Sequence, residues 1–98
     1  MFRHVVLFRF RDDAPAPSID AALDAVRELA DAVPTVRAVE VHTDAGESPD
    51  NHQAAAVVTF DDVAGYRVYR DHPAHLRVVT EELKPLLSDR AAIQVDVS

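Results

Sequence analysis

The chain has 98 residues, of which 48% are hydrophobic and 28% are charged, and this composition predicts one folded domain, residues 1–98, instead of a disordered chain. It has no cysteine, which excludes disulfides, a thiolate nucleophile and a cysteine-ligated metal site. The net charge of −7 comes from 17 acidic residues against 10 basic residues, and the basic ones are scattered, so we expect no nucleic-acid partner.

The first predicted element is a strand over residues 2–10, FRHVVLFRF, which is rich in β-branched and aromatic types. His4, Val6 and Phe8 point to one face of this strand, and Val5 and Leu7 point to the other. Charges within the stretch argue against a signal peptide, and no run in the chain is long enough to span a membrane. We therefore expect a cytoplasmic protein without membrane contacts.

A long helix is predicted next, after the proline-containing loop DDAPAP. Ser18 is its predicted N-cap, and Pro34 is predicted to end it. Residues at helical spacing form its predicted inward face: Ile19, Leu23, Val26, Ala30 and Val33.

Two strands follow, at residues 36–43, VRAVEVHT, and at residues 53–60, QAAAVVTF. The loop between them contains Gly46, and Pro49 in this loop blocks strand pairing. The small side chains of residues 54–56 leave space beside the second of these strands, where a ligand or a large neighbouring side chain fits.

Two short helices are predicted at residues 62–70 and 73–83. Asp61 or Asp62 can cap the first, and Pro73 suits the first position of the second, where its missing N–H is not needed. The predicted inward positions are Val63, Tyr66 and Tyr69 on the first helix and Leu76, Val79 and Leu83 on the second.

The last predicted element is a strand over residues 91–97, AAIQVDV. The order β-α-β-β-α-α-β is an α+β, ferredoxin-like arrangement, with helices on one face of a four-stranded antiparallel sheet. The other face is predicted to keep apolar side chains: Val5, Leu7, Val39, Val41, Val57 and Ala92. Because such a patch usually marks an interface, we expect a homodimer that pairs sheet against sheet.

The stretch YRDHPAHLRVV, residues 69–79, carries two candidate catalytic residues, Tyr69 and His75. If Pro73 starts a helix, His75 lies in its first turn, where unpaired N–H groups disfavour a positive charge, so we expect a neutral imidazole. A neutral imidazole can remove an α-proton while a phenol donates to a carbonyl oxygen, which is acid–base chemistry without a cofactor. The alternative is that both rings serve only packing and capping.

Four further residues are candidates for ligand binding: His4, Val6, Phe8 and His72. His4 shares the apolar face of the first strand with Val6 and Phe8, and a buried histidine needs a partner, such as His75, Tyr69, a ligand or the backbone. His72 is the predicted N-cap of the last helix. It lies three residues before His75, but no third ligand stands at a diagnostic spacing, so no metal site is predicted.

Four segments resemble the stress-responsive A/B barrel (Dabb) domain family: HVVLFRF, VTFDD, YRVYRDHPAHLRVV and the closing IQVDV. The most specific of them is Y-x-x-H-P-x-H, and the resemblance covers essentially the whole chain. It implies small dimers of ferredoxin-like subunits that form a dimeric α+β barrel. By likeness to a plant polyketide cyclase of this family, the catalytic tyrosine and histidine correspond to Tyr69 and His75, and a pocket histidine corresponds to His4.

Three functions follow from this pattern and this resemblance. The first is cofactor-independent acid–base catalysis on a small apolar or polyketide-like ligand, with cyclase-like proton transfer or aldol chemistry. The second is a stress-related homodimeric binding protein without turnover. The third is haem handling with His75 as axial ligand, which the absence of tryptophan disfavours.

Overall fold

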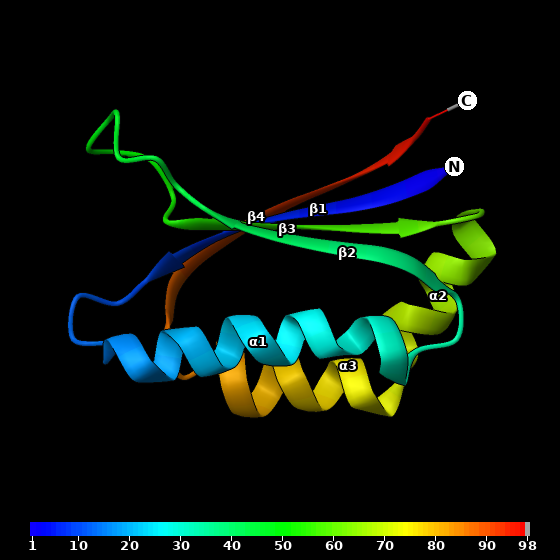
Figure 1. Ribbon diagram of the computed structural model, residues 1–98, viewed down its shortest axis with the longest axis horizontal. Helices are drawn as coiled ribbons and strands as arrows, with labels where there is room; N and C mark the ends of the chain where they lie inside the picture. Colours follow the sequence, from blue (N-terminus) through cyan, green and yellow to red (C-terminus); the bar gives the residue numbers. More distant parts are fainter. Residues whose placement is uncertain (98) are drawn as a thin grey trace.

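The computed structural model of the chain describes residues 1–97, which form a four-stranded antiparallel sheet with the helices on one face (Figure 1). The elements are β1 (Phe2–Phe10), α1 (Ala16–Ala32), β2 (Val36–Thr43), β3 (Ala54–Phe60), α2 (Val63–Asp71), α3 (Pro73–Arg77), a π-helical segment η1 (Val78–Leu83) and β4 (Leu87–Asp96). The strand order β2-β3-β1-β4 confirms the predicted ferredoxin-like α+β fold. Within the described residues, no helix has the length and apolar character needed to cross a membrane.

The core lies between the helices and the inner face of the sheet, and strand alternation decides which residues enter it. Every second residue of β1 and β3 is buried, ending with Phe10 and Phe60. Val58 and Phe60 are 1% and 0% exposed, and they pack with Leu29 and Tyr69 from the helices. A buried phenylalanine contributes several kcal/mol, so this cluster fixes where the helices sit on the sheet.

Helix α1 differs from its prediction at its start and in its buried face. Pro15 occupies the N-cap and no side chain caps the helix, so the prediction that Ser18 is the cap is wrong. The buried residues are Ala22, Leu23, Val26 and Leu29, whereas Ala30 is exposed. Both stripes have helical spacing, and the observed one buries more apolar surface because leucine is larger than alanine.

The crossover from β3 to β4 begins with the predicted caps. The Asp62 carboxylate accepts a hydrogen bond from the Gly65 N–H at 3.0 Å, and His72 Nδ1 accepts one from the Ala74 N–H at 3.0 Å. Pro73 is the first residue of α3, as predicted. Two predicted inward side chains are not inward: Val63 lies at the very start of α2 and is 38% exposed, and Leu76 is 50% exposed.

The second half of the crossover is a π-helical segment and not a regular α-helix. The Lys84 N–H donates to the Val79 carbonyl, five residues back, at 2.9 Å. A π-turn holds more residues than an α-turn, so it changes which side chains share a face. Here Val79, Leu83 and Lys84 all face the space beneath the sheet, and Leu83 is buried.

The outer face of the sheet, away from the helices, has a different composition from the predicted one. A β-bulge between Val36 and Ala38 changes the alternation of β2, so Val39 and Val41 pair with the inward residues Val58 and Ala56. Ala92 pairs with Val6 and is likewise inward. Strand register gives the outer apolar face as Val5, Leu7, Ala55, Val57, Ala91, Ile93 and Val95.

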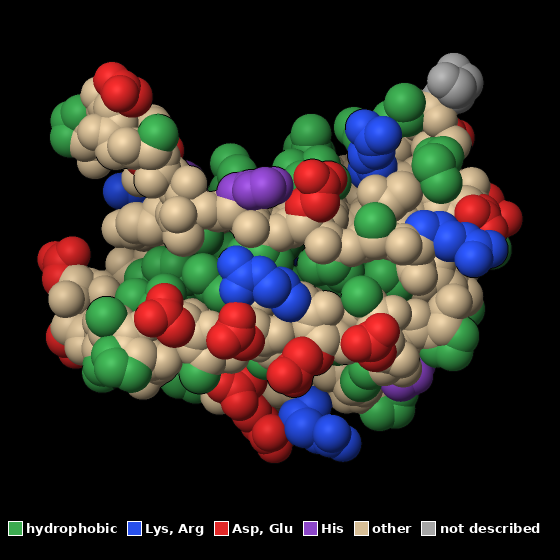
Figure 2. All heavy atoms as spheres, in the orientation of Figure 1, with side chains coloured by type: hydrophobic (Ala, Val, Ile, Leu, Met, Phe, Trp, Pro, Cys, Tyr) green, Lys and Arg blue, Asp and Glu red, His purple; other side chains and the backbone are tan. Residues whose placement is uncertain are grey.

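This outer apolar face is open to solvent in a single chain. Leu7 is 39% exposed and Ile93 is 60% exposed. Figure 2 shows hydrophobic side chains above the sheet, on the side opposite the helices, while Asp and Glu side chains spread over the helical layer. The two surfaces therefore differ in character: one is apolar and the other is acidic.

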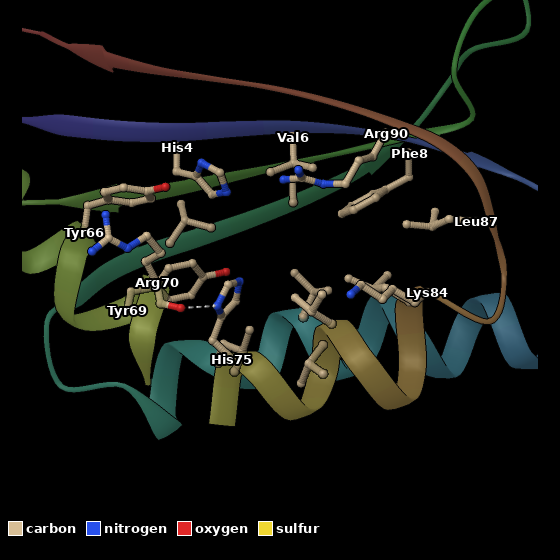
Figure 3. Close-up of a pocket in the computed structure, with 17 residues that line it drawn as sticks. His4, Val6, Phe8, Tyr66, Tyr69, Arg70, His75, Lys84, Leu87 and Arg90 are labelled. Atoms are coloured by element: carbon tan, nitrogen blue, oxygen red, sulfur yellow. Dashed lines mark hydrogen bonds between the residues drawn. The ribbon is translucent and has the colours of Figure 1, made fainter. Parts of the chain in front are cut away.

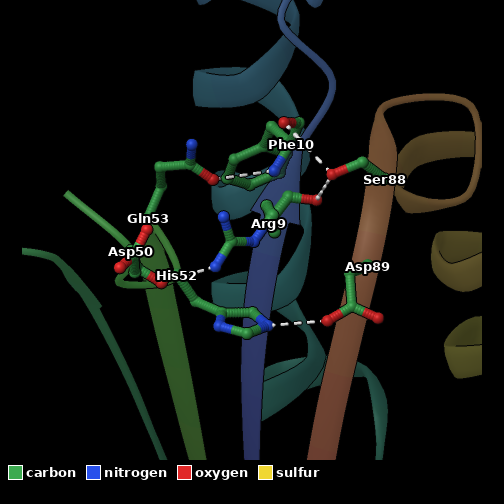
Figure 4. A network of polar contacts seen from close by, with 7 residues as sticks. All are labelled: Arg9, Phe10, Asp50, His52, Gln53, Ser88 and Asp89. Carbon is green, nitrogen blue, oxygen red and sulfur yellow. Dashed lines mark hydrogen bonds and ion pairs between the residues drawn. The ribbon is translucent and has the colours of Figure 1, made fainter.

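The loop between β2 and β3 is fastened to the sheet by polar contacts (Figure 4). Gly46 turns this loop with a φ of 84°, which a side chain rarely tolerates. The side chain of Gln53 accepts a hydrogen bond from the Phe10 N–H at 2.8 Å, and His52 Nε2 lies 2.9 Å from an Asp89 carboxylate oxygen on β4. Arg9 donates to the Asp50 carbonyl. These contacts hold the loop at the end of the sheet farthest from α2.

Candidate active site

A cavity of about 330 Å³ lies between the inner face of the sheet and the helices (Figure 3). Its wall is mostly apolar, and β1, α1, β3 and η1 all contribute to it. Polar side chains reach it at two places. His4, Tyr66, Tyr69 and His75 gather at one end, and Lys84 and Arg90 lie toward the other (Figure 3).

Tyr69 and His75 lie side by side in this wall, with ring centroids 4.2 Å apart and planes inclined by 36°. The interruption between helices α2 and α3 brings them together. His72 has an extended backbone, because the residue before a proline disfavours helical dihedrals, and Pro73 then starts a new helix. The first turn of that helix places His75 beneath the end of α2.

The orientation of the His75 ring fixes its tautomer. Its Nδ1 lies 3.1 Å from the Arg70 carbonyl oxygen, which can only accept, so Nδ1 carries the proton and Nε2 keeps a lone pair. Burial lowers the pKa of His75 below its usual value of 6.5, and the positive charge of Arg90 lowers it further, although the hydrogen bond to Arg70 opposes the change. The imidazole is therefore neutral at pH 7, with a basic nitrogen available.

The Tyr69 hydroxyl is a proton donor in this site. The residue is 3% exposed, and burial raises the pKa of the phenol well above its usual value, so it stays protonated. The Tyr69 hydroxyl forms no hydrogen bond within residues 1–97, and it is not among the fully buried polar atoms that lack a partner, so its oxygen atom is accessible although the residue as a whole is buried. Because Tyr69 lines the cavity, the hydroxyl opens onto the cavity and is free to bind a ligand.

His4 provides a second donor. It is 5% exposed, and its Nδ1 lies 2.8 Å from the side-chain nitrogen of Gln94, which can only donate, so the ring carries its proton on Nε2. Burial lowers the pKa of His4 to about 4, with the charge of Arg90 as a smaller cause. Its ring lies 5.2 Å from Tyr66 and 6.2 Å from Tyr69, which places this neutral donor at the same end of the cavity.

Acid should destabilise the fold through His4. The unfolded chain binds a proton at this residue below about pH 6.5, whereas the folded chain does so only near pH 4, so this contribution to stability is present above pH 6.5 and lost as the pH falls toward 4. The loss amounts to about 3 kcal/mol. Urea unfolding at pH 7 and pH 4.5 should show a smaller pH effect in His4→Gln, which cannot titrate. Equal pH effects in the two proteins would contradict the shifted pKa.

The remaining sequence candidates divide between the cavity and its surroundings. Val6 and Phe8 line the cavity, as does His4. His72 does not line it; its Nδ1 accepts a hydrogen bond from the Ala74 N–H at the start of α3. Within residues 1–97, no three His, Asp or Glu side chains lie close enough together to hold a metal ion.

Sequence reasoning missed several side chains at the site, and three of them lie at or near its polar end: Gln94, Arg90 and Tyr66. Gln94 and Arg90 lie on β4 opposite His4 and Phe8, so they share the inner face. Their alternation with Ile93 and Ala91 was a usable signal once the pairing of β1 with β4 was assumed. Tyr66 was predicted to point inward but was not named as a site residue, and it helps to line the cavity.

The arrangement brings two donors and one base to one end of an apolar cavity. The donors are the Tyr69 hydroxyl and His4 Nε2–H, and the base is His75 Nε2. A carbonyl oxygen held by the donors would place the adjacent carbon near the base. This set of groups suits proton abstraction next to a carbonyl.

Comparisons with known proteins agree with the fold. The sequence model of the stress-responsive A/B barrel domain matches residues 2–97. A dimeric ferredoxin-like protein of unknown function from Thermobifida fusca is 30% identical over 98% of this chain and 90% of that chain, with a TM-score of 0.87. No match to a curated protein was found.

Two more distant structures share the fold. A Dabb family protein from Mesorhizobium loti is 23% identical over 99% of this chain and 96% of that chain, with a TM-score of 0.82. The hydroxynitrile lyase from Passiflora edulis is 21% identical over 99% of this chain and 93% of that chain, with a TM-score of 0.89. The family match extends over nearly the full chain, and the chain therefore belongs to the stress-responsive A/B barrel (Dabb) family.

Proposed function

We propose that this protein binds a small carbonyl compound in the cavity and catalyses proton transfer next to the carbonyl, of the kind used in aldol and polyketide-cyclising reactions, without a cofactor. His75 is the general base in this proposal, Tyr69 is the proton donor to the carbonyl oxygen, and His4 orients the ligand. The observation that carries it is the adjacency of the Tyr69 and His75 rings, 4.2 Å between centroids, in the wall of a cavity of about 330 Å³.

The chemical step follows from the protonation states. His75 Nε2 takes a proton from the carbon next to the carbonyl, and the electron pair of that C–H bond moves to form the enolate. The Tyr69 hydroxyl and His4 Nε2–H stabilise the negative charge that develops on oxygen. Such donors in a water-poor site lower the barrier by several kcal/mol. Attack of the enolate carbon on a second carbonyl, with return of the proton from His75, completes an aldol closure.

The protein acts as a homodimer in this proposal, with the outer apolar faces of two sheets packed together. The similar structures from Thermobifida fusca and Bacteroides fragilis are described as dimeric, which supports this assembly. The cavity lies on the opposite, helix-covered face of the sheet. Dimer formation therefore leaves the cavity entrance clear of the packed sheets and stiffens the strands that carry His4 and Arg90.

Proton exchange tests the catalytic proposal. We expect the protein to accelerate deuterium incorporation next to the carbonyl of 3-oxooctanoate in D₂O above the buffer rate, measured by NMR. The double variant Tyr69→Phe/His75→Ala should return exchange to the buffer rate. Arg67→Ala removes an exposed polar side chain of α2 that does not line the cavity and serves as the control. Unchanged exchange in the double variant would exclude these residues from the chemistry.

A binding protein without turnover is the second candidate, and the packing of Tyr69 favours it. The Tyr69 ring lies 5.3 Å from Phe60 in the core, so this residue also stabilises the fold. In that case the wild-type protein would bind 3-oxooctanoate without accelerating exchange, and the double variant would lose melting temperature as well as affinity.

A further inference from the structure

The basic residues of the cavity are at odds with the rest of the molecule. The chain carries a net charge of −7, yet three basic residues line the cavity, Arg70, Lys84 and Arg90, and no acidic residue does. Arg70 forms an ion pair with Asp71 at 2.9 Å. Lys84 and Arg90 form no ion pair with any residue in the described range 1–97.

Arg90 is placed at the cavity by the sheet. It pairs with Phe8 across β1 and β4, and Phe8 faces the helices, so Arg90 projects from the same inner face. Figure 3 shows its side chain extending along the sheet beside Val6 and Phe8, over the cavity. Its charge also contributes to the lowered pKa values of His4 and His75, which is consistent with a guanidinium close to the polar end of the cavity.

Lys84 is placed at the cavity by the π-helical segment. In a regular α-helix, five residues turn about 140° beyond one full circle, which would point Lys84 away from the face that carries Val79. The hydrogen bond from the Lys84 N–H to the Val79 carbonyl closes a wider turn, and both residues line the cavity. The irregular segment thus adds a cation opposite Arg90, and π-turns are frequent at functional sites.

We propose that the cavity takes its ligand as a carboxylate, an oxo acid whose carboxylate lies against Arg90 and Lys84 while its carbonyl oxygen lies at the Tyr69 and His75 end. The carbonyl half of this assignment rests on the function proposed above, and the carboxylate half rests on the two cations alone. A guanidinium suits a planar carboxylate because it donates two parallel hydrogen bonds. The apolar wall between the two ends accommodates the hydrocarbon part of the acid.

A pair of isosteric ligands tests the carboxylate half. Octanoate and octanamide have the same chain and nearly the same shape, and only octanoate is charged. By titration calorimetry at low salt, we expect octanoate to bind at least 10-fold more tightly than octanamide. Added salt should weaken octanoate alone. Octanoate has no keto group, so the result is decided independently of any turnover.

Single substitutions test which residues cause the preference for octanoate over octanamide. Arg90→Gln should weaken octanoate on the order of 10- to 100-fold and leave octanamide unchanged, and the retained octanamide affinity shows that the variant is folded. Lys84→Gln should act in the same direction with a smaller effect. Arg67→Gln removes an exposed cation that does not line the cavity and is the matched control.

Three outcomes would overturn the proposal. The first is equal binding of octanoate and octanamide to the wild-type protein, or no measurable binding of octanoate at millimolar concentration. The second is an equal loss of both ligands in Arg90→Gln. The third is tighter binding of octyl phosphate than of octanoate by more than 10-fold, which would assign the cations to a phosphate group.

Discussion

His75→Ala should reduce the rate of proton exchange in 3-oxooctanoate by about 10²- to 10⁴-fold, the usual contribution of a general base. The reason is that His75 offers the one basic ring nitrogen at this end of the cavity. Its Nδ1 donates to the Arg70 carbonyl, so Nε2 keeps its lone pair, whereas His4 is held in the opposite tautomer by Gln94. Burial keeps the imidazole neutral at pH 7. The rate measured under saturating ligand checks this value.

The pH dependence of the exchange rate distinguishes a base from a structural residue. A base must be unprotonated, and the pKa of His75 is lowered from 6.5, so the rate should be constant near pH 7 and fall only at a pH below 6.5. Tyr69→Phe should lower the plateau and keep the same acid limb, because the phenol stays protonated throughout this range. An acid limb that persists in His75→Ala would assign the titration to another group and contradict the role of His75.

Much of this site follows from local sequence patterns. Alternation along β1 places His4, Val6 and Phe8 together on the inner face, and the structure confirms that face. Pro73 ends one helix and begins the next. Tyr69 and His75 lie on either side of this break between the helices, and the sharp turn there predicts that their rings come close together. Both inferences need only the geometry of one element and its neighbour.

The features that could not be predicted from sequence patterns either depend on pairing between distant segments or have no local signature. The β-bulge near Ala38 reverses the faces of Val39 and Val41, and a bulge leaves no distinctive residue in a valine-rich strand. The π-turn that turns Lys84 inward likewise has no local signature in VVTEEL. Arg90 becomes recognisable only when β4 is aligned with β1. The cationic side of the cavity was hidden for these reasons.

Replacing either of the two most exposed large side chains of the outer apolar face should separate the proposed dimer. Leu7 and Ile93 are 39% and 60% exposed and lie on the neighbouring strands β1 and β4. An aspartate at either position would bury an unpaired carboxylate between the sheets, at a cost of about 3–5 kcal/mol. That cost raises the dimer dissociation constant on the order of 10²- to 10⁴-fold for each carboxylate, and the change acts on both subunits because the interface is symmetric.

Sedimentation at micromolar concentration should then find the wild-type protein as a dimer and Leu7→Asp or Ile93→Asp as a monomer. Leu76→Asp is the matched control, because Leu76 is 50% exposed and lies on α3, on the helical side of the sheet. It introduces the same charge at a similarly exposed leucine, and it should leave the dimer intact. Dissociation by Leu76→Asp with a stable dimer in Ile93→Asp would move the interface from the sheet to the helices, where it would cover the acidic surface instead of the apolar one.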